Sequence, residues 1–217
     1  MITVYTSNES LIQALVDDGH LKTPIIIEAF QHVDRVHFMP KEQHTFAYLN
    51  QALPIGHEQT ISQPLTVAFM LELLEPRTGE KILDIGSGSG WQTALLAYIV
   101  GKNDTEDKGK IIAIERIPEL QKMTEQNIST CSSIKKSVVT VVGGDGSKGY
   151  KQEAPFDKII AAAAATELPS AWKEQLIIGG KIVAPISSSI YCIERTDEKS
   201  FTQKRYFGFS FVPLIEE

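Results

Sequence analysis

The residues best suited to chemistry form a glycine-rich segment, DIGSGSG, at residues 84–90. It follows an apolar run and precedes a stretch with helical periodicity. Glycines permit a tight turn and let a ligand approach the backbone closely, and the first turn of a helix offers unpaired N–H groups. Such a segment between a strand and a helix is typical of a nucleotide-binding loop. The alternative is a turn that only reverses the chain.

The spacing of the acid and the glycines discriminates between nucleotides. A dinucleotide-binding G-x-G-x-x-G segment would have its third glycine at position 91, which is Trp91. The form here is D-x-G-x-G-x-G, with the acid two residues before the first glycine. A carboxylate there suits S-adenosylmethionine, because this cofactor carries an ammonium and a sulfonium group and no phosphate. We therefore expect cofactor contacts from Asp84, Gly86, Ser87, Gly88 and Gly90.

Two further acids follow the next two apolar runs. Glu115 ends residues 111–115, where a carboxylate can accept hydrogen bonds from both ribose hydroxyls, and Arg116 belongs to the same expected site. Asp145 and Gly146 follow the third run and are expected to receive the adenine amino group and to leave room for the ring. The alternatives are a solvated loop acid for Glu115 and a turn cap for Asp145.

Apolar runs and helical stretches alternate from residue 81 onward, and their order predicts the elements that position the loop. Nearly continuous apolar strands separated by helices indicate a mostly parallel sheet covered on both faces. We expect an α/β fold with a doubly wound, Rossmann-like sheet of the S-adenosylmethionine-dependent methyltransferase type. The expected strands are residues 81–86, 111–115, 138–142, 157–163 and 181–186, and helices are expected from Trp91, Pro118 and Pro169.

The sheet is expected to end in an antiparallel C-terminal edge. Residues 189–195 and 204–212 are typical of a hairpin, and the strand before them is expected to follow a turn at Gly179 and Gly180. Three aromatic residues alternate along the last strand and are expected to face the core: Phe207, Phe209 and Phe211. The polar residues 101–110 are expected to form a solvated surface loop.

The first sixty residues are expected to form a helical extension (1–60) packed on the main domain (61–217). Ser7 or Asn8 can cap a first helix that ends near Gly19. The next helix is expected to start at Pro24, because proline fits the first helical turn.

The segment between the extension and the main domain is less regular. Residues 38–59 contain two prolines and a glycine and are expected to form loops and short pieces that join the extension to the main domain. A helix is then expected to open at Ser62, with a buried face made of Val67, Met70, Leu71 and Leu74.

Composition and charge exclude several classes of protein. The 217 residues are 42% apolar and 22% charged, which is ordinary for a globular chain. A net charge of −6 gives no bulk attraction to nucleic acid or anionic membrane, and no apolar stretch approaches the roughly 18 residues of a membrane span.

Cys131 and Cys192 form no CxxC pair, and the amino terminus lacks the pattern of a secretory signal. We expect a cytoplasmic monomer that binds neither nucleic acid nor membrane.

No metal site is expected. His57 and Glu58 are adjacent, but no third ligand has a suitable spacing. A nucleic-acid methyltransferase is also disfavoured, because residues 161–169 read AAAAATELP and lack an Asn/Asp-Pro-Pro-aromatic motif.

Several segments resemble the protein-L-isoaspartate O-methyltransferase family. They are LPIGHEQTISQP (53–64), ILDIGSGSGW (82–91), IERIPEL (114–120), GDG (144–146), APFDKII (154–160), EQLIIGGKIVAPI (174–186) and FVPL (211–214). Their order and spacing match from about Thr23 to Leu214. Many methyltransferases share the glycine loop, whereas QTISQP together with FVPL is far more specific.

The resemblance implies transfer of a methyl group from S-adenosylmethionine to the free carboxylate of isoaspartyl residues in damaged proteins. The ester then collapses to a succinimide, and hydrolysis returns some normal aspartate. Ser62 takes the family's active-site serine position. The resemblance places the cofactor at Asp84, Gly86, Gly88, Glu115, Asp145 and Gly146, and the substrate beside Thr60, Ile61, Gln63, Val212 and Pro213.

The chemistry agrees with this set of residues. A carboxylate has an unperturbed pKa of about 4, so the substrate is already ionised at neutral pH and needs no general base. Alignment in a dry site is then the expected source of catalysis. Ser62 is expected to orient the substrate and not to act as a covalent nucleophile, since no His–Asp pair accompanies it. The alternative role for Ser62 is the cap of the helix that follows it.

Three residues near these motifs depart from the family pattern. Glu58 replaces a usual glycine, Ser210 a usual arginine and Asn50 a usual aspartate. The first two changes make the region more negative, whereas Asn50 acts oppositely by removing a negative charge. We expect intact cofactor binding with altered or weakened isoaspartyl recognition. Two other functions stay open: a methyltransferase of the same fold acting on a different carboxylate, and a non-catalytic S-adenosylmethionine-binding protein.

Overall fold

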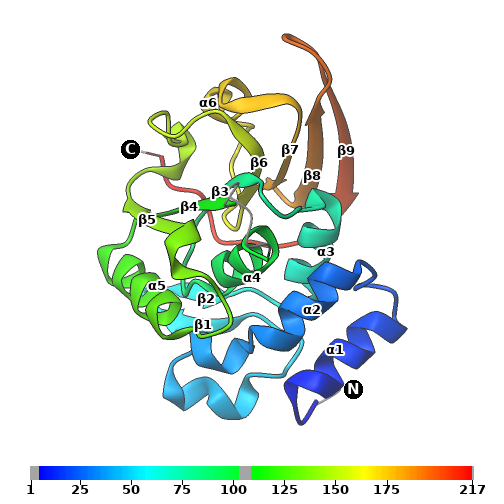
Figure 1. Cartoon of the computed structure of the whole chain (residues 1–217), viewed down its shortest axis with the longest axis vertical. Coiled ribbons are helices and arrows are strands. Elements are labelled where there is room, and N and C mark those ends of the chain that lie inside the picture. Colours follow the sequence, from blue (N-terminus) through cyan, green and yellow to red (C-terminus); the bar gives the residue numbers. More distant parts are fainter. Residues whose placement is uncertain (1–4, 103–108, 217) are drawn as a thin grey trace.

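The computed structural model describes residues 5–102 and 109–216. A seven-stranded sheet with the order β5-β4-β3-β6-β7-β8-β9 forms its centre (Figure 1). The strands from β5 to β7 are parallel, and β8 and β9 are antiparallel, which confirms the expected fold class. The strands are β3 (Lys81–Ile85), β4 (Lys110–Glu115), β5 (Val139–Gly143), β6 (Phe156–Ala161), β7 (Leu176–Ile186), β8 (Ser189–Arg195) and β9 (Phe201–Phe207).

Alternate residues of the strands face two hydrophobic clusters. On β3, Ile82 belongs to the cluster that buries residues of helices α1 to α5, and Leu83 belongs to the cluster that includes Trp172 of α6. Because both faces are covered, apolar residues are favoured on both faces of the central strands, which explains their nearly continuous apolar runs. The helices are α1 (Asn8–Asp17), α2 (Pro24–His32), α3 (Pro64–Leu74), α4 (Trp91–Val100), α5 (Pro118–Thr130) and α6 (Ser170–Glu174). No helix within the described ranges is long and apolar enough to cross a membrane.

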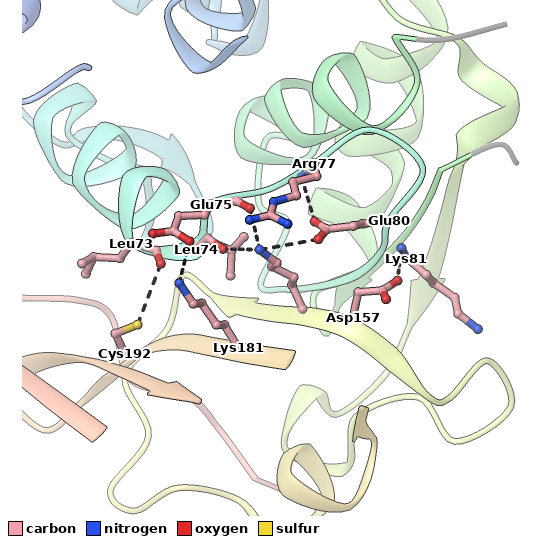
Figure 2. Close-up of polar contacts among 10 residues, drawn as sticks. Leu73, Leu74, Glu75, Arg77, Glu80, Lys81, Asp157, Lys181 and Cys192 are labelled. Carbon is pink, nitrogen blue, oxygen red and sulfur yellow. Dashed lines mark hydrogen bonds and ion pairs between the residues drawn. The ribbon is translucent and has the colours of Figure 1, made fainter. Parts of the chain in front are cut away.

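A buried lysine closes the C-terminal end of α3. Lys158 of β6 donates from its amine to the carbonyl oxygens of Leu74, at 2.7 Å, and Glu75, at 2.5 Å. Burial lowers the pKa of Lys158. Figure 2 shows the same end of the helix, where Lys181 reaches the Glu75 carboxylate at 2.7 Å. Lys158 therefore supplies a donor to the buried Leu74 carbonyl and to the partly buried Glu75 carbonyl at this helix end.

The N-terminal residues contain more regular structure than the sequence indicated. Ser7 caps α1, as expected. Residues 38–59 form loops and short pieces as expected, but two of the pieces pair as antiparallel strands that the sequence pattern does not indicate, β1 (Leu53–Gly56) and β2 (Gln59–Ile61). Two 3₁₀ helices precede them, η1 (Arg35–Phe38) and η2 (Lys41–Phe46). The expected boundary between residues 60 and 61 falls inside β2, so the hairpin straddles it.

The C-terminal strands differ from expectation in two places. Strand β7 begins at Leu176 and includes Gly179 and Gly180, so the turn expected there is absent; a register shift against β6 takes its place. Strand β9 ends at Phe207, whose side chain is 71% exposed, so its expected core position is wrong. Phe209 lies beyond the strand and stacks on Phe69, with 5.1 Å between ring centroids. Residues 103–108 of the expected surface loop lie outside the described residues.

Candidate cofactor and substrate site

A cavity of about 610 Å³ opens at the carboxyl ends of the parallel strands. Strands β4 and β5 lie on one side of β3, and the chain then crosses to place β6 on the other side of β3. The carboxyl ends of these strands are therefore at the switch point, where such sheets bind ligands. The floor is formed by residues that follow β3, β4, β5 and β6. One wall is the β1–β2 hairpin with the start of α3, and the other is the segment 208–215. In Figure 1 this last segment, in red, runs from the end of β9 back toward β5.

The glycine loop takes the backbone conformation that its sequence requires. Gly86, Gly88 and Gly90 have φ values of 79°, 56° and 86°, which side chains with a Cβ rarely adopt. Helix α5 holds the loop from outside, because Thr124 donates to the Gly88 carbonyl at 2.9 Å and Asn127 to the Ser89 carbonyl at 2.8 Å. Gly86, Ser87 and Gly88 line the cavity, whereas Gly90 is the N-cap residue of α4 and packs against α5.

Glu115 presents a fixed carboxylate to the cavity. Its Oε2 accepts from the Gly88 N–H at 2.9 Å, and its Oε1 accepts from the Ile117 N–H at 3.0 Å. The residue is 7% exposed and lines the cavity. Each carboxylate oxygen can accept a second hydrogen bond, so the group is oriented to receive two donors from a ligand. Arg116, the next residue, is exposed at the rim of the same cavity.

Asp84 lies behind the loop and does not line the cavity. It is fully buried and accepts from Gln92 Nε2 at 2.8 Å and from Thr93 Oγ1 at 2.6 Å. Burial, and then the charge of Glu115, raise the pKa of Asp84 to about 6. Gln92 itself lines the cavity. Because its amide nitrogen faces Asp84, its amide oxygen is available for another donor. Asp84 thus orients a residue that the sequence did not single out.

Asp145 caps the short 3₁₀ helix η4 (Gly146–Lys148), the alternative considered for it from the sequence. Its side chain accepts from the Ser147 N–H at 2.9 Å and lies 3.4 Å from the Lys148 amine. Gly144 and Gly146 line the cavity on either side of it. A Cβ at Gly146 would stand 2.4 Å from a methyl carbon of Ile85, so only glycine fits there.

Ser62 lies on the hairpin wall with a hydroxyl that is free to bind. Thr60, Ile61, Ser62 and Gln63 all line the cavity. Helix α3 begins at Pro64 with Gln63 at its N-cap position, so Ser62 neither opens nor caps the helix and that expectation is wrong. Within the described part of the chain, the hydroxyl has no hydrogen-bond partner. The neighbouring Gln63 side chain is held by the Asn50 carbonyl at 3.0 Å.

The opposite wall carries the other expected substrate residues. Val212 and Pro213 line the cavity together with Ser210. The wall is held to the end of β6 by two hydrogen bonds, from the Ala164 N–H to the Val212 carbonyl and from the Leu214 N–H to the Ala164 carbonyl, both 2.8 Å. Ala162 and Ala163 also line the cavity, where small side chains leave space.

No metal centre lies here among the residues that the structure describes. His57 and Glu58 form the exposed turn of the hairpin. The sequence did not single out the aromatic residues Phe209 and Phe211, nor Ser89 and Gln92, as site residues. Ser89 belongs to the glycine loop and Phe211 to the FVPL segment, whereas Gln92 and Phe209 lie outside these motifs and reach the cavity only through the fold.

Comparison with known proteins agrees with this geometry. Residues 6–217 match the family model of protein-L-isoaspartate(D-aspartate) O-methyltransferase. A protein-L-isoaspartate O-methyltransferase of Methanopyrus kandleri is 38% identical over 97% of this chain and 92% of its own, and one of Staphylothermus marinus is 40% identical over 92% and 89%.

A solved structure has the same fold. A Plasmodium falciparum protein described as a protein-L-isoaspartate O-methyltransferase, in complex with S-adenosyl-L-homocysteine, superposes with a TM-score of 0.85. It covers 98% of this chain and all of its own at 24% identity. From the family model and the two sequence relatives, the chain belongs to the protein-L-isoaspartate(D-aspartate) O-methyltransferase family.

Proposed function

We propose that this chain transfers a methyl group from S-adenosylmethionine to the free carboxylate of isoaspartyl residues, and of D-aspartyl residues, in damaged proteins. The observation that carries the proposal is that one cavity holds both the Glu115–glycine loop pair and the unpartnered Ser62 hydroxyl. The sequence relatives bear the same activity in their names. The reaction, and the repair of damaged proteins that follows from it, is therefore the function we assign.

The cofactor side fits S-adenosylmethionine by its donors, acceptors and space. Glu115 accepts the two ribose hydroxyls, and Gly146 leaves room for the adenine ring beside Asp145. Gly86 and Gly88 let the amino-acid end approach the backbone, with Ser87 and Gly90 shaping the loop. The bound cofactor supplies a methyl group on a sulfonium, which is an activated leaving group. Glu115 places a carboxylate in the cavity, and no lysine of the described residues lines it to cradle a phosphate, which suits that cation.

The substrate side orients a carboxylate. Ser62 donates its hydroxyl proton in a hydrogen bond to one carboxylate oxygen and leaves the other to attack the methyl group. Thr60, Ile61 and Gln63 hold the peptide from one wall, and Val212 and Pro213 from the other. No side chain has to remove a proton, because the carboxylate is ionised at neutral pH. Rate enhancement then comes from alignment of the reacting atoms.

Two residues near the cavity bear on whether the substrate is an isoaspartyl peptide or a different carboxylate. Ser210 lines the cavity where the family usually has a cation, and Glu58 adds a carboxylate to the turn of the β1–β2 hairpin, which forms the other wall. Both favour weaker binding of an anionic peptide than is usual, or a different carboxylate as substrate. A Glu58→Gly variant is expected to lower the KM for an isoaspartyl peptide; an unchanged KM argues that the turn does not face the substrate.

A Ser62→Ala variant tests the proposal at its carrying residue. Loss of one hydrogen bond to a charged group removes about 1.5–3 kcal/mol, so kcat/KM for an isoaspartyl peptide is expected to fall about 10- to 100-fold. Affinity for S-adenosylhomocysteine, measured by calorimetry, is expected to stay the same. Ser129→Ala, on the exposed side of α5, is the matched control. Wild-type kinetics in Ser62→Ala would contradict the assigned role.

Two finer features complete the proposal. We propose that the protein works in the cytoplasm, which is supported by the unpaired Cys131 and Cys192. We propose that it acts as a monomer, since one chain supplies both walls of the cavity. The acidic net charge of −6 supports a preference for protein substrates over nucleic acid or membrane.

A further inference from the structure

Arg35 is a buried cation outside the site described above. It opens η1 and is fully buried, and no carboxylate of the described residues lies within ion-pair distance of its guanidinium. Burial lowers the pKa of Arg35 to about 9, so the group stays charged at neutral pH. An apolar residue of similar size in place of a buried ion is often neutral or stabilising. Stability alone therefore does not account for an arginine at this position.

The guanidinium holds the base of the β1–β2 hairpin. Its Nη2 donates to the Gln51 carbonyl before β1, at 2.8 Å, and to the Ser62 carbonyl after β2, at 3.0 Å, with a longer contact of 3.5 Å to the Ile61 carbonyl. Nη1 donates to the Ala47 carbonyl at 2.8 Å and to the Leu49 carbonyl at 3.3 Å. One side chain thus joins both ends of the hairpin and fixes the backbone that carries the Ser62 hydroxyl.

The same side chain also packs behind a residue of the cofactor half of the cavity. Its guanidinium carbon lies 5.4 Å from the ring centroid of Trp91, the first residue of α4 after the glycine loop. Trp91 lines the cavity, and its indole N–H donates to the Val33 carbonyl at 3.2 Å. Arg35 is therefore packed between the wall that bears Ser62 and the helix that follows the glycine loop.

We infer that Arg35 is a positioning residue for methyl transfer: it sets the place of Ser62 relative to the glycine loop, and its unpaired charge behind Ser62 favours a substrate with a carboxylate. The inference rests on the proposed function and extends it to a residue that does not touch the cavity. The hydrogen bonds govern alignment and so kcat, whereas the charge governs the binding of an anion and so KM. If Arg35 only supported the fold, substitutions that keep or remove its charge would not affect kcat and KM differently.

Two substitutions distinguish these contributions. Arg35→Met removes the charge and all donors, and kcat for an isoaspartyl peptide is expected to fall at least 10-fold while KM rises about 10-fold. Arg35→Lys keeps the charge but cannot reach both ends of the hairpin, so kcat is expected to fall similarly while KM stays within about threefold of wild type. Displacements near 1 Å in an aligned site can change rates about 100-fold. Affinity for S-adenosylhomocysteine is expected to stay within threefold in both variants.

The matched control is Tyr48→Phe. The Tyr48 hydroxyl donates to Asp34 at 3.0 Å and holds the same N-terminal segment without touching the hairpin base. Its kinetic constants are expected to match wild type. The inference is overturned if Arg35→Lys has the kcat of wild type, if its KM rises as far as in Arg35→Met, or if Tyr48→Phe shows the same losses. If Arg35→Met does not fold, Arg35→Lys decides alone. A wild-type protein that methylates no isoaspartyl peptide would instead refute the proposed function.

Discussion

Asp84→Asn gives the sharpest stability prediction, because this carboxyl group is fully buried beside a second acid. Its pKa is raised from 3.8 to about 6 in the folded chain, first by burial and then by Glu115. As the pH rises from 4 to 6, the unfolded chain gives up the Asp84 proton while the folded chain keeps it. Unfolding therefore becomes more favourable over this range, and the loss of stability is complete above about pH 6.

The magnitude follows from the two pKa values. The difference between 3.8 and about 6 corresponds to about 3 kcal/mol once both states are ionised. About 1 kcal/mol of this is already lost at pH 4.5, because most of the unfolded chain is ionised there. Between pH 4.5 and pH 7.5 the wild type should thus lose about 2 kcal/mol that Asp84→Asn does not lose.

Asparagine is the suitable replacement because it preserves the local hydrogen bonds. Its amide oxygen can accept from Gln92, and its amide nitrogen can donate to the Thr93 hydroxyl. Urea unfolding of both proteins without cofactor, at pH 4.5, 6.0 and 7.5, measures the difference in unfolding free energy. Equal m-values in both proteins serve as the control for two-state behaviour. A difference that stays constant across the three pH values would refute the reasoning.

Three further predictions follow from single contacts. Glu115→Ala should weaken S-adenosylhomocysteine binding about 100-fold in calorimetry, since the two charge-assisted hydrogen bonds to the ribose hydroxyls are lost. An affinity within threefold of wild type would show that Glu115 does not hold the ribose. Glu58→Gly should raise the unfolding free energy in urea by about 1 kcal/mol, because Glu58 has a φ of 58° in the hairpin turn, a conformation that glycine adopts without strain. A lower urea midpoint for the variant would contradict this. Lys158→Met should lower the unfolding free energy by about 2–4 kcal/mol, because the buried Leu74 carbonyl and the partly buried Glu75 carbonyl lose their donor. A loss below about 0.5 kcal/mol would mean that water replaces the amine.

The central sheet could be predicted from the sequence because its strands are buried on both faces. Residues 81–86 and 111–115 are mostly apolar at consecutive positions, which is typical of strands that are covered on both faces. The glycine loop and Glu115 then follow from their place after those strands. These inferences use local sequence and the known geometry of parallel sheets, so they hold without tertiary information.

The hairpin could not be predicted, because its signals are atypical. Its turn residues are His57 and Glu58, both with positive φ, where asparagine and glycine are preferred. Pro54 inside β1 also argues against a strand. Tertiary contacts compensate, above all the hydrogen bonds of Arg35 to the residues at both ends of the hairpin. The role of Arg35 itself depends on a carbonyl cluster that no sequence pattern displays.

The cavity walls illustrate the same limit. Ser62 was expected to begin a helix, but Pro64 begins it, and the serine hydroxyl is left beside the cavity. Phe209 and Phe211 were assigned to a strand, whereas they lie in the segment that returns across the sheet. Where a chain leaves a helix or strand, residue periodicity no longer predicts its path. The path then depends on long-range contacts, such as the hydrogen bond between Ala164 and Val212.

The most direct measurement is methyl transfer from labelled S-adenosylmethionine to two peptides that differ only at one residue. One contains an L-isoaspartyl residue and the other a normal aspartyl residue at the same place. The account predicts base-labile methyl ester on the isoaspartyl peptide alone, with the wild-type protein and with Ser129→Ala. Equal labelling of both peptides, or no label on either despite tight S-adenosylhomocysteine binding, would contradict it.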